Sequence, residues 1–118
     1  MAEADPLDVE QAQALVEQKR RSGAAGRLGL AQALAELSQA LEKVDREQEA
    51  EGAARDSVNT LAPDFLANPR QFAAPMRALV GQYVTLAQRR GGHPDETVLG
   101  PIAQALGELT RAEDAEED

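Results

Sequence analysis

Residues 30–44 read LAQALAELSQALEKV and carry the most regular pattern in the chain. Large apolar side chains recur in this stretch at spacings of four, three, four and three residues, at Leu30, Leu34, Leu37, Leu41 and Val44. A repeat of about 3.5 residues is typical of helices that pack against a neighbouring helix with interlocking side chains. The pattern therefore predicts a helix with an apolar stripe, here called the leucine stripe, that requires a helical neighbour.

Beyond the leucine stripe the same helical positions become polar, because they fall on Gln48 and Glu51. Gly52 weakens a helix by about 1 kcal/mol relative to alanine, but the first residue that stops one is Pro63. Two descriptions therefore remain open, one long helix over residues 28–61 or two helices broken near Gly52. We expect the long helix.

The N-terminal segment carries the signals of a shorter helix. Asp5 is a good N-cap and Pro6 suits the first helical position. The basic residues 19–21 fit the negative end of a helix dipole, and the Ser/Gly/Ala segment 22–26 then predicts a turn.

Residues 62–75 contain three prolines, which predict short turns in place of a continuous helix. Pro75 is expected to open a helix with Met76, Leu79 and Tyr83 on its apolar face, ending with Gly91 in the left-handed conformation. The three aromatic residues of the chain all lie between residues 65 and 83. If a true core exists, we expect it there.

A last helix is expected to begin near Asp95. Residues 112–118 are strongly acidic and contain no large apolar side chain, which predicts a disordered tail. No stretch shows the alternation of a β-strand. The sequence therefore predicts an all-α fold, a small bundle of about four helices, with residues 1–111 as a single domain.

Composition excludes several kinds of chemistry. The chain has 118 residues, no cysteine and one histidine, and only 3% of its residues are aromatic. Without cysteine there is no disulfide framework and no thiolate ligand or nucleophile. The single histidine, His93, lies in a Gly/Pro turn, and no phosphate-binding loop or Glu-x-x-His pair occurs. We therefore expect no enzymatic activity, no metal, no cofactor and no small-molecule substrate.

Charge also limits the partners. The formal net charge is −9 and the isoelectric point is near 4.6, which repels nucleic acid at long range. Arginines gather in residues 19–27 and 70–90, and we expect them to pair with the chain's own surplus carboxylates. No apolar run approaches the roughly 20 residues that span a membrane, and the acidic N-terminus is unlike a signal peptide. We therefore expect a soluble, cytoplasmic protein without nucleic-acid or membrane contacts.

These features together predict a binding function. The core is rich in alanine, which buries little area, so the leucine stripe is expected to exceed what the chain can cover by itself. We therefore expect a helical protein–protein interaction module, such as an assembly subunit, an adaptor or a chaperone-like protein. We expect it to bind a partner protein or to form a homo-oligomer. The expected partner-binding residues are those of the stripe together with three from the helix after Pro75, namely Leu30, Leu34, Leu37, Leu41, Val44, Met76, Leu79 and Tyr83.

A second hypothesis rests on the carboxylates. Residues 42–56 and the acidic tail could imitate a phosphate backbone and occupy the basic site of a nucleic-acid-binding protein. Binding of that kind weakens steeply with ionic strength, whereas contact through an apolar stripe barely responds to salt. The two hypotheses are therefore distinguished by the salt dependence of partner binding.

Overall fold

The computed structural model describes residues 9–21 and 27–116, with the last four of these described in their backbone only. Among these residues the chain forms five helices and no strand, which confirms the all-α class and adds one helix to the expected four. The predicted helix start at Asp5 and the predicted turn at 22–26 lie outside the described residues. The helices are α1 (Val9–Arg21), α2 (Arg27–Lys43), α3 (Glu47–Ala67), α4 (Pro69–Arg89) and α5 (Glu96–Glu116).

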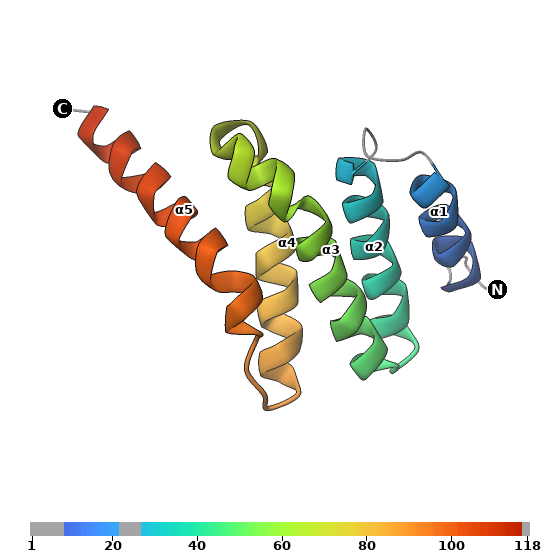
Figure 1. The fold of residues 1–118 in the computed structure, drawn as a ribbon. Helices are drawn as coiled ribbons and strands as arrows, with labels where there is room; N and C mark the ends of the chain where they lie inside the picture. Colours follow the sequence, from blue (N-terminus) through green and yellow to red (C-terminus); the bar gives the residue numbers. More distant parts are fainter. Residues whose placement is uncertain (1–8, 22–26, 117–118) are drawn as a thin grey trace.

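The helices lie side by side in chain order (Figure 1). Each of α1 to α3 packs on the next helix along the chain, and α5 packs on both α3 and α4. Helix α4 also touches α2, where Gln82 Nε2 donates a hydrogen bond of 3.0 Å to the carbonyl oxygen of Ala35. Helix α3 is therefore the centre of the molecule, with α2 and α4 on its two sides. No helix in the described part of the chain is both long and apolar enough to cross a bilayer.

The expected long helix over 28–61 is wrong, because the chain reverses between Lys43 and Glu47. Asp45 adopts a left-handed conformation with a φ of 64°. The N–H of Arg46 donates to the carbonyl of Leu41, the pattern that closes the last turn of a helix. Reversal lets α3 fold back along α2 and bury alanines between the two helices, which a straight helix would leave in water.

This turn yields a stability prediction. Replacing Asp45 with valine should lower the free energy of unfolding by about 1–2 kcal/mol, because a β-branched side chain clashes with the backbone at positive φ. Asparagine tolerates the left-handed region as aspartate does, so Asp45→Asn is the matched control and should stay within about 0.5 kcal/mol of the parent. Urea unfolding followed by circular dichroism measures both. Equal stability of the two variants would contradict the turn geometry.

The expected short turns over 62–75 are also wrong. Helix α3 continues through Pro63 to Ala67, and α4 already begins at Pro69 and continues through Pro75. Pro69 sits in the first turn of its helix, where no hydrogen bond is lost. Pro63 removes the N–H that would bond to Asn59, but both residues are exposed, so water can satisfy the freed carbonyl.

The core lies where the aromatic residues predict it. Phe65, Met76 and Tyr83 are buried, together with Leu61 and other residues of α3 and α4, and Ile102 of α5 completes the cluster. Gly91 has a φ of 77° and ends α4 as expected. Between α2 and α3 the contact is made by alanines, because their small side chains let the helix backbones approach closely. The fully buried alanines of this contact are Ala31, Ala50 and Ala54.

Two buried serines add polar contacts to this interface without leaving an unpaired group. Ser38 Oγ donates to the carbonyl oxygen of Ala50 at 2.7 Å, linking α2 to α3. Ser57 Oγ donates within α3 to the carbonyl oxygen of Ala54 at 2.6 Å. Since buried hydroxyls without a partner are costly, the Ser38 bond favours one register of α2 against α3, while the Ser57 bond satisfies its hydroxyl within α3.

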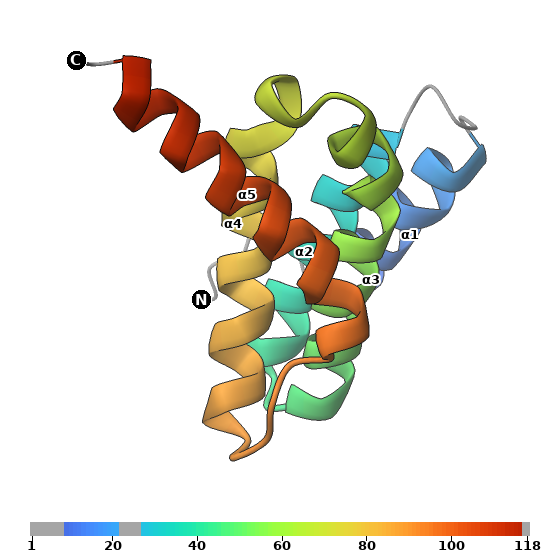
Figure 2. The same cartoon turned by 60° about the vertical axis from the view of Figure 1, so that its left-hand side comes forward.

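Helix α5 is preceded by a capping residue. Asp95 Oδ1 accepts hydrogen bonds from the Thr97 N–H at 3.0 Å and the Thr97 hydroxyl at 2.6 Å, and these bonds lower the pKa of the Asp95 carboxyl. The Asp95 N–H in turn donates to the Tyr83 hydroxyl oxygen at 2.7 Å, which ties α5 to the core. The helix diverges from α4 toward its C-terminal end (Figure 1), and its last turns extend beyond the other helices (Figure 2). It continues beyond Arg111 to Glu116, so residues 112–116 of the expected tail are helical, and 117–118 lie outside the described residues.

Candidate partner-binding groove

The structure divides the leucine stripe into parts with different surroundings. Leu34 and Leu41 are buried, with exposed fractions of 3% and 4%, and Leu30 and Leu37 are half-buried. Val44 lies beyond the end of α2 and is 53% exposed. Leu34 belongs to a small apolar cluster with Val16 of α1, separate from the main core, whereas Leu41 belongs to the main core. Helix α1 is therefore the helical neighbour that covers much of the stripe.

The other expected partner-binding residues lie inside the main core. Met76, Leu79 and Tyr83 of α4 are all buried against α3 and its neighbours. A partner could reach them only after α4 had moved away from α3. These three residues therefore serve the packing of the chain itself.

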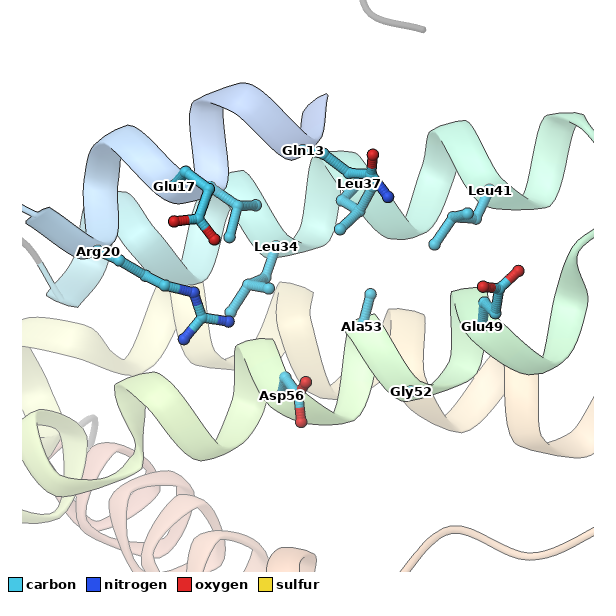
Figure 3. Close-up of a pocket in the computed structure, with 11 residues that line it drawn as sticks. Gln13, Glu17, Arg20, Leu34, Leu37, Leu41, Glu49, Gly52, Ala53 and Asp56 are labelled. Carbon is cyan, nitrogen blue, oxygen red and sulfur yellow. The ribbon is translucent and has the colours of Figure 1, made fainter. Parts of the chain in front are cut away.

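A groove of about 600 Å³ is lined by residues of α1, α2 and α3 (Figure 3). Its volume falls within the range of sites that bind ligands in proteins. All three helices contribute to it, and α2 supplies the three central leucines of the stripe. The lining residues are Gln13, Val16, Glu17 and Arg20 of α1, Leu34, Leu37 and Leu41 of α2, and Glu49, Gly52, Ala53 and Asp56 of α3.

The groove has an apolar interior between polar rims. Leu34, Leu37 and Leu41 point into the space between the walls in Figure 3. On the α1 side the rim carries Glu17, with Arg20 at the end of the groove next to Leu34. Such a combination of apolar interior and charged margin is typical of surfaces that bind an amphipathic helix.

The rim on the α3 side carries two carboxylates. Glu49 forms a two-pronged ion pair with Arg46, in which Arg46 Nη2 donates to Glu49 Oε2 at 2.8 Å and Arg46 Nε donates to the other oxygen. These hydrogen bonds lower the pKa of Glu49, so it is ionised at neutral pH. Asp56 is exposed on the same wall of the groove. Counted over all lining residues, three carboxylates face a single guanidinium. Since Arg46 already compensates Glu49, the groove keeps a small excess of negative charge from Glu17 and Asp56.

Gly52 leaves room in the α3 wall. A β-carbon built at this position meets no atom within 4 Å, although the residue is half-buried in the middle of a helix. From the sequence alone, Gly52 is predicted only to destabilise a helix relative to alanine. In the folded chain it lines the groove, and a larger side chain there would project into open space within it.

Sequence reasoning found the leucines of the groove and missed both of its walls. The α3 wall has a signal that could have revealed it, since Glu49, Gly52, Ala53 and Asp56 are spaced so as to share one helical face. The α1 wall has no comparable signal. Gln13, Glu17 and Arg20 are exposed polar residues that line a groove only because α1 packs on α2.

Three arginines of the two basic segments, Arg27, Arg89 and Arg90, pair with the chain's own carboxylates. Arg27 Nη1 donates to Asp64 Oδ1 at 2.7 Å. Arg89 forms an ion pair with Glu42, and Arg90 forms one with Glu51. These contacts tie the ends of α2 and α4 to their neighbours.

The groove is lined by apolar, carboxylate, amide and guanidinium side chains. It includes no histidine, serine or tyrosine, and His93 is exposed in the turn before α5. Among the described residues no group of three or more histidine or acidic side chains could hold a metal ion. No protein-family model, curated protein or solved structure matches the chain.

Proposed function

We propose that this protein is a helical protein–protein interaction module and that the groove between α1 and α3 receives apolar side chains of a partner helix. The observation that supports this most is the half-buried Leu37 at the floor of an open groove, flanked by the buried Leu34 and Leu41. Covering an exposed leucine surface is favourable, by about 1.5–3 kcal/mol for a whole side chain. Helix-in-groove binding uses anchors spaced three and four residues apart, which suits a narrow groove that follows α2.

The groove narrows the binding surface expected from the sequence. Of the eight residues expected to contact a partner, Leu34, Leu37 and Leu41 line the groove. Leu30 packs with the cluster between α1 and α2, so it supports the floor from behind. The proposed contact surface therefore includes fewer residues of the leucine stripe, but it also includes the polar residues of α1 and α3 on the two sides of the groove.

The alternative of an acidic regulator has less support. Six carboxylates lie in residues 42–56, and Glu42, Glu49 and Glu51 are engaged in ion pairs with the chain's own arginines. Paired carboxylates are poorer imitations of a phosphate backbone, since their charge is already compensated. We therefore favour the groove as the functional surface.

A tryptophan in place of Gly52 tests the proposal. The probe is a helical peptide about three heptads long, with leucine at the a and d positions and glutamine elsewhere. The peptide should bind the parent protein, and Gly52→Trp should weaken binding by roughly thirtyfold, the scale of a lost central contact. Isothermal titration calorimetry measures the affinity. Because tryptophan is a better helix former than glycine, the variant should keep the helical content of the parent.

Gly81→Trp is the matched control, because Gly81 also lies inside a helix, in α4, with open space around a built β-carbon. It should leave peptide binding unchanged. Light scattering reports whether a second copy of the chain is the occupant, in which case Gly52→Trp converts an oligomer to a monomer. A parent that is monomeric and does not bind the peptide, or equal loss of binding in both variants, would overturn the proposed function.

A further inference from the structure

The helix that forms one wall of the groove is strongly acidic. Helix α3 carries five carboxylates and a single arginine between Glu47 and Ala67. Helix α4, which covers the opposite side of α3, carries three arginines and no carboxylate between Pro69 and Arg89. A helix of one charge is thus covered on one side by a helix of the opposite charge.

The ion pairs show how that side of α3 is compensated. On the α4 side Arg90, directly after α4, pairs with Glu51 of α3. From α2, Arg27 pairs with Asp64 near the other end of α3. The side that faces the groove meets α1, which carries both acidic and basic residues. There Asp56 is exposed, and Glu49 is paired with Arg46 from the turn that precedes α3. Glu17 of α1 lines the groove on the side opposite α3 (Figure 3).

From this arrangement we infer that the groove selects a basic amphipathic helix of a partner protein, with lysine or arginine on both sides of an apolar stripe. This inference rests on the proposed function and names the class of its partner. The apolar stripe of the partner contacts Leu37, while its cations lie beside Glu17 on one rim and Asp56 on the other. Arg20 lies beside Glu17 at the end of the groove next to Leu34, and it is one cation against three carboxylates among the lining residues. Opposite charges along the two rims favour the correct partner over acidic helices.

A second copy of the chain fits this requirement poorly. Among the described residues α4 is the helix with arginines and no carboxylates, and its apolar face is buried in the core by Met76, Leu79 and Tyr83. Helix α5 carries more carboxylates than arginines. The net charge of −9 also opposes association of two copies at low salt.

Three matched peptides test the inference. They share one leucine stripe and differ only in the residues beside it, which are lysine, glutamine or glutamate. In about 50 mM salt the lysine peptide should bind the parent protein roughly tenfold more tightly than the glutamate peptide, and the difference should shrink at about 500 mM salt. Fluorescence anisotropy measures the three affinities.

Reversing the charge of two groove residues tests whether the preference for the lysine peptide arises in the groove. The double variant Glu17→Lys with Asp56→Lys should invert the order, so that the glutamate peptide binds more tightly than the lysine peptide. The control is Glu96→Lys with Glu108→Lys, which makes the same change of net charge at exposed positions on α5. This control should keep the order of the parent.

Two results would overturn the inference. Equal affinity of the parent protein for the lysine and glutamate peptides would show that the rims do not select charge. If the control variant on α5 also inverted the order of the peptides, the preference would come from the net charge of the molecule and not from the groove. In either case the proposed function survives if the glutamine peptide still binds and Gly52→Trp still prevents it, so the two failures are distinguishable.

Discussion

Replacing Phe65 with alanine is expected to lower the free energy of unfolding by about 3–5 kcal/mol, the largest effect of any substitution considered for this chain. The Phe65 side chain is fully buried in α3 and packs in the cluster that joins α3, α4 and α5. Truncation removes apolar burial and leaves a cavity that the surrounding helices fill only in part. Since small domains are stable by about 5–15 kcal/mol, the variant loses a large share of its stability.

Leu66 supplies the control for this experiment. It is the next residue in the same helix, and its side chain is 45% exposed. Leu66→Ala should change the free energy of unfolding by less than about 1 kcal/mol, because nearly half of its surface already faces water. Urea unfolding monitored by circular dichroism at 222 nm compares the two variants with the parent. Equal destabilisation by both would contradict the placement of Phe65 in the core.

The second prediction concerns the alanine contact between α2 and α3. Ala54→Leu should lower the free energy of unfolding by about 1–3 kcal/mol, although leucine is the more apolar residue and an equally good helix former. Ala54 is fully buried, as are Ala31 and Ala50 of the same cluster. A leucine at this position must push the two helices apart or adopt a strained rotamer. The groove would change as well, since α2 and α3 form its floor and one wall.

Ala74→Leu is the corresponding control, because Ala74 lies within α4 and is exposed. This variant should stay within about 0.5 kcal/mol of the parent. The same urea titration serves for both substitutions, and the probe peptide with glutamine flanks shows whether Ala54→Leu also weakens binding. If Ala54→Leu stabilised the chain, the α2–α3 contact would have to contain unfilled space, contrary to the close helix packing described above.

The buried alanines also explain why the groove is open. Fully buried alanines of α2 and α3 belong to the main core, whereas the smaller cluster between α1 and α2 combines Ala33 with the larger Val16 and Leu34. Helices α1 and α3 thus stand on two sides of α2 without packing on one another as α3 and α4 do. The leucines between them are sheltered by both helices and covered completely by neither.

Much of the fold follows from local features of the sequence. Helix formers without β-branched runs determine the all-α class, and Leu34 and Leu41 are buried on α2 as their spacing predicts. Phe65, Met76 and Tyr83 form the core because few other large side chains are available to do so. Gly91 adopts positive φ because a helix end is followed there by residues that cannot extend it.

Other features depend on contacts between residues far apart in the chain. The break at Asp45 has no strong local signal, and it forms because folding back lets α2 and α3 bury their alanines against each other. Pro63 remains inside α3 because the residues around it face water, which no local rule reveals. The groove arises only when α1 and α3 both pack on α2. Local propensities are fixed by neighbours in the sequence, whereas chain reversals and grooves depend on which distant surfaces come together in the tertiary structure.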